Sequence, residues 1–99
     1  MAVDGKSTPV TDNAAESRFE LQVEGRTAVL EYVRRGDAVV YVHTGVPPEL
    51  EGRGIGGQLA KFALDDARTR GLKVVARCPY VAAYIERHPE YADLLASAS

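Results

Sequence analysis

The chain has 99 residues, of which 45% are hydrophobic and 26% charged, and its formal net charge is −2. This length limits it to one small domain, and the composition is that of a globular protein. The weak negative charge provides no electrostatic basis for binding nucleic acid or an anionic membrane, so neither is expected as a partner. Cys78 is the single cysteine, which excludes an intramolecular disulfide. Since we also find no long apolar run or signal peptide, we expect a cytoplasmic protein.

The first half of the chain predicts a tail followed by three strands. Residues 1–17 are mostly polar and are expected to be a disordered tail, so the single domain is expected to span residues 18–96. Apolar and polar residues alternate over residues 18–24, and β-like runs follow at 27–33 and 38–46. Short glycine-containing links join these runs, which favours an antiparallel meander.

The second half predicts a helix, a strand and a second helix. Ile55, Leu59, Phe62, Ala63 and Ala67 recur at helical spacing, and we expect this helix to end near Gly71. Residues 72–76 are typical of a central strand, and residues 81–87 of a short helix. The order is β-β-β-α-β-α. A strand–helix–strand unit makes its two strands parallel, so we predict an α+β fold with a mixed sheet.

Four glycines among the six residues 52–57 open the first helix. A glycine turn at a helix start presents unpaired main-chain N–H groups at the positive end of the helix dipole, which favours phosphate or pyrophosphate. The lysine and hydroxyl of a P-loop are missing, because Gln58 and Leu59 follow Gly57. The glycine spacing also differs from the dinucleotide fingerprint. The alternative is a tight turn that only lets the helix pack closely on the sheet.

The residues around this turn carry a family resemblance. A buried strand, the run Val46-Pro47-Pro48-Glu49-Leu50, and then Glu51-x-x-Gly54-Ile55-Gly56 before an amphipathic helix resemble the acetyl-coenzyme A site of the GNAT N-acetyltransferase superfamily. The pattern of that family is Arg/Gln-x-x-Gly-x-Gly/Ala. The segments His43-Thr44-x-Val46 and Cys78–Tyr91 are similar to its minimal subfamily, called YjdJ-type or NATD1-like.

This resemblance implies a compact GNAT-like fold that binds acetyl-coenzyme A and transfers the acetyl group to an amine, without a metal. The acceptor would be a small-molecule amine or a protein lysine, and the protein a monomer or weak homodimer. Two departures matter. Glu51 stands where the family has Arg or Gln, although Arg53 could offset its charge. The strand and two helices that larger members place before the meander were not found in the sequence.

The resemblance also assigns residues to the cofactor. The pantetheine would run between residues 41–46 and 74–78, and a backbone N–H near Val46 would bond the acyl carbonyl. The expected cofactor-binding residues are Thr44, Val46, Glu51, Gly52, Arg53, Gly54, Ile55, Gly56, Gly57, Cys78, Tyr80, Tyr84 and Arg87.

Three residues are candidates for the chemistry. His43 is the candidate base, because histidine titrates near neutral pH, or else a histidine satisfied within its strand. Cys78 is a candidate nucleophile at a helix start, or else a small residue packed beside the cofactor. Tyr84 is the candidate acid for the leaving thiolate, although Ile85 aligns with the tyrosine of the family. The alternative to an enzyme is a non-catalytic module that binds coenzyme A or acyl-coenzyme A.

Overall fold

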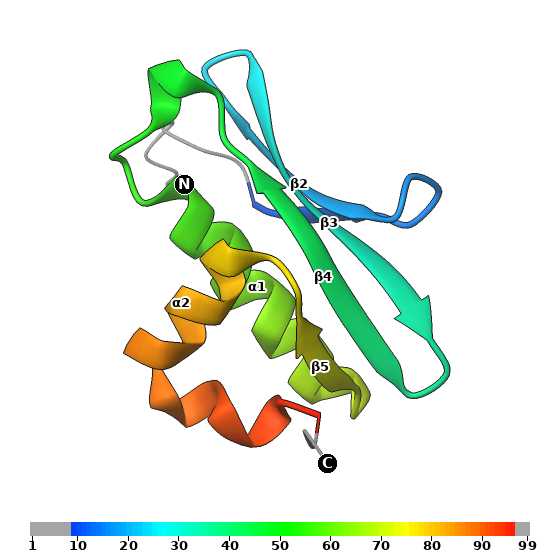
Figure 1. The fold of residues 1–99 in the computed structure, drawn as a ribbon. Helices are drawn as coiled ribbons and strands as arrows, with labels where there is room; N and C mark the ends of the chain where they lie inside the picture. Colours follow the sequence, from blue (N-terminus) through cyan, green and yellow to red (C-terminus); the bar gives the residue numbers. More distant parts are fainter. Residues whose placement is uncertain (1–8, 97–99) are drawn as a thin grey trace.

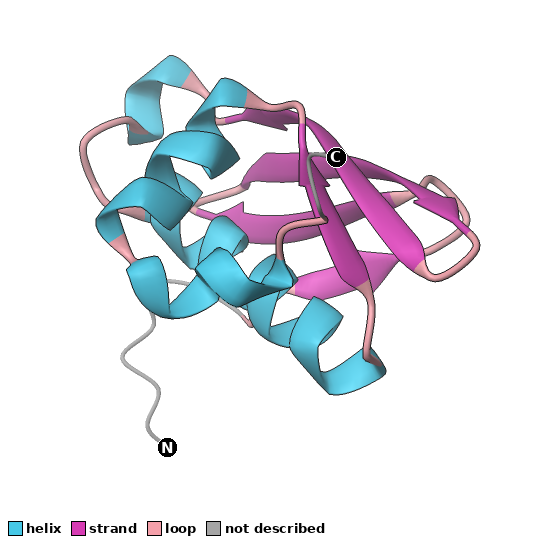
Figure 2. Cartoon of the chain, turned by 60° about the horizontal axis from the view of Figure 1, so that its bottom comes forward, coloured by secondary structure: helices cyan, strands magenta, loops and turns pink. Residues whose placement is uncertain are grey.

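A computed structural model describes residues 9–96, and in it a five-stranded sheet carries its helices on one face (Figures 1 and 2). The strand order is β1-β2-β3-β4-β5. The strands β2 (Arg18–Val23), β3 (Arg26–Arg35) and β4 (Ala38–Gly45) form the predicted antiparallel meander. Helix α1 (Ile55–Arg70) crosses to β5 (Lys73–Ala76), which pairs with β4 in parallel. Helix α2 is Pro79–Arg87, and short 3-10 helices cover Pro48–Leu50 (η1) and Pro89–Leu94 (η2). The predicted α+β class and the parallel unit are confirmed.

A short strand precedes the meander, so the prediction of a disordered tail is wrong for residues 11–17. Strand β1 (Thr11–Asn13) pairs antiparallel with β2, and residues 14–17 make the turn between them. The Tyr32 hydroxyl donates a 2.5 Å hydrogen bond to Asp12, and the Asn13 amide donates one of 3.0 Å to Glu20. Hydrophobic alternation could not reveal a strand of three polar residues held by side chains of other strands. Residues 9 and 10 are described without regular secondary structure, and residues 1–8 of the predicted tail lie outside the described residues.

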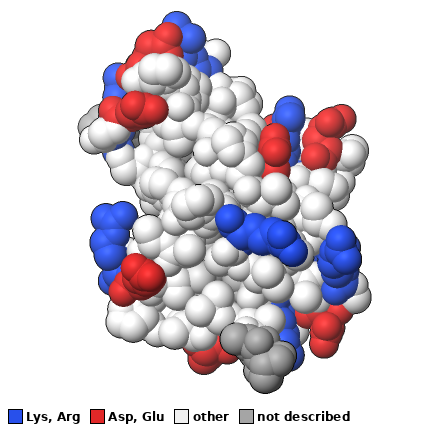
Figure 3. All heavy atoms as spheres, viewed as in Figure 1, with Lys and Arg blue, Asp and Glu red and all other residues white. Residues whose placement is uncertain are grey.

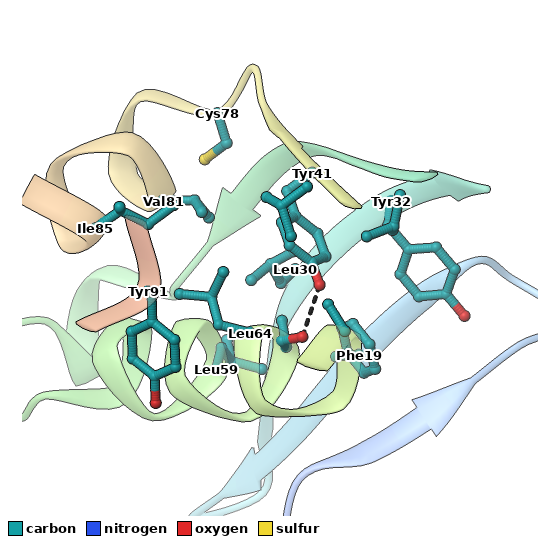
Figure 4. Close-up of a cluster of buried hydrophobic side chains, with 14 of the residues drawn as sticks. Phe19, Leu30, Tyr32, Tyr41, Leu59, Leu64, Cys78, Val81, Ile85 and Tyr91 are labelled. Carbon is teal, nitrogen blue, oxygen red and sulfur yellow. Dashed lines mark hydrogen bonds between the residues drawn. The ribbon is translucent and has the colours of Figure 1, made fainter. Parts of the chain in front are cut away.

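The core lies between the sheet and the two α-helices (Figure 4). Phe19, Leu30 and Tyr41 contribute from the sheet, and Leu59 and Leu64 from α1, all at most 2% exposed. The Tyr41 hydroxyl donates a hydrogen bond of 2.6 Å to the carbonyl oxygen of Ala63 in α1, which is the dashed line in Figure 4. This bond ties the middle of the sheet to the helix.

Phe62 differs from its predicted place on the buried stripe of α1. Its side chain is 37% exposed and meets the Phe19 ring edge-on at a centroid distance of 5.5 Å. The other four predicted positions are buried, and the full buried set of α1 is Ile55, Gly56, Leu59, Ala60, Ala63, Leu64 and Ala67. Small alanines let the helix approach the sheet closely, which leaves the large Phe62 ring at the margin of the core.

A bulge in β4 changes the direction of its side chains. The pairing with β3 passes from Tyr32↔Tyr41 to Glu31↔His43, so Val42 is an extra residue on β4. Tyr41 and Thr44 therefore both face the helices, since their partners Tyr32 and Leu30 do. His43 faces the other way with its partner Glu31. We call the sheet surface opposite α1 and α2 the open face.

Strands β4 and β5 separate halfway along β4. Their pairing ends at Tyr41↔Ala76, while β4 continues along β3 to Gly45. The N–H groups of Arg77 and Cys78 both donate to the Tyr41 carbonyl, at 3.1 and 2.9 Å, as the chain turns into α2. The β5 side of residues 42–45 is consequently free of strand pairing, as the resemblance had implied.

Candidate active site

The start of α1 is built to receive an anion. Gly54 is its N-cap, with φ 75° and ψ 15°, and no side chain caps the helix. The first intrahelical bond runs from the Gln58 N–H to the Gly54 carbonyl, at 3.0 Å. The N–H groups of residues 55–57 therefore have no intrahelical partner, and the first turn contains no acidic residue. Such a group of donors favours phosphate.

A cavity of about 480 Å³ opens at this helix start. Its lining combines the end of β4, the loop through η1, the first turn of α1 and one residue of α2: Thr44, Val46, Leu50, Glu51, Gly52, Gly54, Ile55, Gly56 and Tyr80. All of these except Leu50 were expected at the cofactor from the sequence. Leu50 is 1% exposed, and the available signal in the sequence was a lone leucine between two glutamates after Pro47-Pro48.

Gly56 and Tyr80 pack together at one wall of the cavity. A Cβ on Gly56 would stand 2.6 Å from Cζ of the Tyr80 ring and 2.7 Å from its hydroxyl oxygen. The absence of a side chain at Gly56 thus lets α2 lay this ring against the first turn of α1. The alternative of a purely structural glycine accounts for this contact, but not for the free N–H groups beside it.

Cys78 lies at the junction of β5 and α2, next to Thr44. It is the N-cap residue of α2, 3% exposed, and its Sγ is 3.3 Å from the Thr44 hydroxyl oxygen. Thr44 lines the cavity, whereas Cys78 does not. The thiol is therefore held behind the wall of the cavity, in contact with it through Thr44.

His43 lies across the sheet from the other candidate residues. The bulge directs it to the open face, where a Cβ on Gly45 would be 3.3 Å from its Nε2. The structure does not bring His43 and Cys78 together. His43 and Cys78 instead lie on opposite faces of the sheet, near the point where β4 and β5 separate. The spacing of the two residues in the sequence could not indicate this arrangement.

Tyr84, Gly57 and Arg87 lie outside the lining of the cavity. The Tyr84 ring stacks on His88 at a centroid distance of 4.0 Å, and a Cβ on Gly57 would be 3.7 Å from it. Burial raises the pKa of Tyr84 above its ordinary 10.0, which makes the phenol a weaker acid. Tyr80, one helical turn earlier, is the tyrosine that reaches the cavity.

Two ion pairs attach the loop before α1 to the β2–β3 turn. Arg53 Nη1 is 2.7 Å from Glu24 Oε2, and Arg26 Nη1 is 3.5 Å from Glu49 Oε2. The hydrogen bond from Arg53 lowers the pKa of Glu24. Arg53 thus points to Glu24 and is absent from the lining of the cavity, whereas Glu51 is part of it.

Within residues 9–96 no cluster of three or more histidine, cysteine or carboxylate side chains could hold a metal ion. None of the helices in that range is both long and apolar enough to span a membrane.

Comparison with known proteins identifies relatives. Residues 18–94 match the family model described as GCN5-related N-acetyl-transferase. Protein NATD1 of Mus musculus is 41% identical over 75 residues, which cover 73% of this chain and 68% of that protein. Protein NATD1 of Gallus gallus is 41% identical over 63 residues, which cover 63% of this chain and 57% of that protein. Protein NATD1 of Xenopus tropicalis is 34% identical over 86 residues, which cover 84% of this chain and 79% of that protein.

Proposed function

Because the chain belongs to the GCN5-related N-acetyltransferase family, we propose that it binds acetyl-coenzyme A on the helix side of the sheet and acetylates an amine. The observation that carries this proposal is the 480 Å³ cavity that joins the uncapped start of α1 to the unpaired end of β4. A cofactor with a pyrophosphate and an extended amide-containing arm needs an anion site and a free strand edge side by side. The residues present fit that requirement.

Each part of the site has a role in this proposal. The N–H groups of residues 55–57 hold the pyrophosphate, and the free edge of residues 42–45 pairs with the amide-containing arm. A main-chain N–H near Val46 bonds the acyl oxygen, which carries more negative charge as the amine attacks. When bound, the cofactor supplies an activated acetyl thioester.

His43 takes the amine proton from the open face, and Tyr80 or Tyr84 protonates the departing thiolate. Direct attack by the amine fits these positions better than a route through Cys78. The Cys78 thiol is buried and bonded to Thr44, while the proposed base lies on the opposite sheet face.

A thermal shift tests cofactor binding. Acetyl-coenzyme A at about 100 times its dissociation constant should add roughly 2.7 kcal/mol to the free energy of unfolding. Pantetheine, which lacks the pyrophosphate, should stabilise the protein much less. In a Gly56→Val variant the added side chain would displace the Tyr80 ring from the wall of the cavity, so this variant should show a smaller shift. Equal melting temperatures with and without millimolar acetyl-coenzyme A would exclude the proposal.

Intact mass spectrometry tests the role of Cys78. After incubation with acetyl-coenzyme A, direct attack predicts no acetyl adduct on the thiol and substantial activity in Cys78→Ala. An adduct that reacts further with an added amine, together with an inactive Cys78→Ala, would instead establish the covalent route.

The non-catalytic alternative rests on one observation, which is that Tyr84 lies outside the cavity. Release of free thiol distinguishes the two functions. An enzyme releases thiol in proportion to an added amine, whereas a binding module shows the thermal shift without amine-dependent release.

A further inference from the structure

The open face of the sheet carries its own groove. This second cavity, about 490 Å³, is lined by Val33, Arg35, Val40, Val42, Val75 and Arg77. Val33 pairs with Val40, and Val40 with Val75, so the three valines lie side by side across β3, β4 and β5. Their sequence neighbours Tyr32, Val39 and Val74 belong to the core on the other face. The helices of residues 9–96 lie on the other face of the sheet (Figure 2).

One end of this groove reaches the proposed reaction centre. Val42 is the bulge residue directly before His43, and Arg77 comes directly before Cys78. The groove therefore meets the point where β4 and β5 separate from the side opposite to the cofactor cavity. From there it follows β4 back toward Arg35, a span of four residues or roughly 13 Å. An amine lying in it would approach with its nitrogen beside His43.

The charge in this groove has one sign. Its charged residues are Arg35 and Arg77, and no carboxylate lines it. Neither arginine makes an ion pair or side-chain hydrogen bond with the described residues. Arg34 and Arg87 share this property, whereas Arg18, Arg26, Arg53, Arg68 and Arg70 are paired. Arginine matches a carboxylate in geometry as well as in charge. A cationic acceptor such as a polyamine would meet repulsion here.

We propose that the acceptor is an amine that bears a carboxylate on an aliphatic body, the chemistry of an aliphatic α-amino acid. Its carboxylate pairs with Arg77, and its side chain lies on the valines toward Arg35. The volume of the groove is within the range of small-molecule sites. The nitrogen forms an amide bond with the acetyl carbon as the carbon–sulfur bond breaks. The proton that the nitrogen loses passes to His43, and the departing thiolate takes a proton from the hydroxyl of Tyr80 or Tyr84 to leave as the thiol. This inference rests on the proposed function.

A matched set of acceptors tests it, with thiol release as the readout. Leucine and leucinamide differ only in the carboxylate, and at a given pH the amide has the larger share of neutral, reactive amine. We expect kcat/KM for leucine to exceed that for leucinamide about tenfold, against this intrinsic trend, and cadaverine to be poorer still. Equal or better use of leucinamide or cadaverine would overturn the inference.

Arginine variants locate the effect. Arg77→Met should lower kcat/KM for leucine about tenfold and leave that for leucinamide unchanged, whereas Arg35→Met, at the far end of the groove, should have a smaller effect. Arg34→Met is the matched control. It removes the charge next to Arg35 in sequence, but Arg34 lies with Tyr32 and Val39 on the helix side. Arg77→Glu should reverse the preference toward cadaverine. Equal losses in Arg34→Met and Arg77→Met would contradict a specific carboxylate site.

The thermal shift with acetyl-coenzyme A separates the two ideas. A shift that persists in Arg35→Met and Arg77→Met shows that the cofactor cavity and the fold are intact. With that shift present, failure to acetylate leucine overturns the acceptor assignment alone. If the wild-type protein shows no shift, the proposed function itself fails.

Discussion

Two glycines at the start of α1 serve different physical purposes. Gly54 has φ +75° with nothing within 4 Å of an added Cβ, so its requirement is conformational. Gly56 has an ordinary helical backbone, but Tyr80 occupies the space of a side chain. The first glycine shapes the turn that exposes the N–H groups, and the second lets Tyr80 form the wall of the cavity.

Replacing Gly54 tests the conformational requirement. Gly54→Ala should lower the free energy of unfolding by about 1–2 kcal/mol, because a left-handed backbone is strained for residues with a Cβ. Gly54→Asn should cost less, since asparagine tolerates this conformation. Urea denaturation measures both. Equal stability of the wild type and Gly54→Ala would show that the turn relaxes to another backbone geometry.

The elements are joined by tyrosine hydroxyls as well as by apolar packing. Tyr41 connects β4 to α1 through the Ala63 carbonyl, and Tyr32 connects β3 to β1 through Asp12. The Tyr91 hydroxyl donates a hydrogen bond of 2.7 Å to Asp65 and so attaches η2 to α1. Each hydroxyl lies at the end of a ring that contributes to the core, so the same residue provides both apolar packing and a hydrogen bond between elements.

Tyr41→Phe isolates one such bond. The variant keeps the ring and loses the 2.6 Å bond to Ala63, whose carbonyl retains its helical partner. The free energy of unfolding should therefore fall by about 0.5–1.5 kcal/mol, and no buried group is left unsatisfied. Chemical denaturation gives the value. A loss above about 3 kcal/mol would mean that the hydroxyl also supports the packing of α1.

Alkaline titration tests the attachment of β1. Burial and the hydrogen bond to Asp12 raise the pKa of Tyr32 to about 12 from its ordinary 10.0. A raised pKa stabilises the folded state fully below pH 10.0, and this contribution disappears as pH rises toward 12. The Tyr32→Phe variant should lose less stability than the wild type between these two pH values. Asp12→Asn should reduce the effect, because it removes the negative charge. Parallel curves for wild type and Tyr32→Phe would contradict this assignment.

At the scale of the whole molecule, the sheet separates two surfaces. The helix side carries the core and the cavity at α1, and the open face carries the groove with Arg35 and Arg77. In Figure 3, acidic and basic side chains lie in small mixed groups with uncharged surface between them, in keeping with the net charge of −2. A reaction between two bound molecules would then take place through the gap between β4 and β5.

Hydrogen exchange distinguishes the two surfaces. Saturating coenzyme A should slow exchange in residues 42–46 and 52–58, because it bonds the free strand edge and helix start. The β3–β4 turn at residues 35–38 serves as an internal control and should not change. Equal protection throughout the chain would indicate general stabilisation without a localised site.

The sequence alone determined the features that depend on local chemistry. The helix of residues 55–70 follows from the spacing of its apolar residues, and the turn before it from glycines that permit a left-handed backbone. The lining of the cavity includes the loop residues Glu51, Gly52, Gly54, Ile55 and Gly56, which the resemblance at the glycine turn assigned to the cofactor, whereas Thr44, Val46 and Tyr80 came from the wider resemblance. The helix and the turn could be predicted because each depends on residues a few positions apart.

Only the tertiary structure decided the features that depend on pairing between distant segments. The extra residue Val42 is visible only against β3, and it sends His43 to the face opposite Thr44 and Cys78. Strand β1 depends on Tyr32 and Glu20, and the preference for Tyr80 over Tyr84 at the cavity depends on how α2 packs against Gly56. Because side-chain direction in a strand alternates, one bulge reverses the assignment of every residue that follows it.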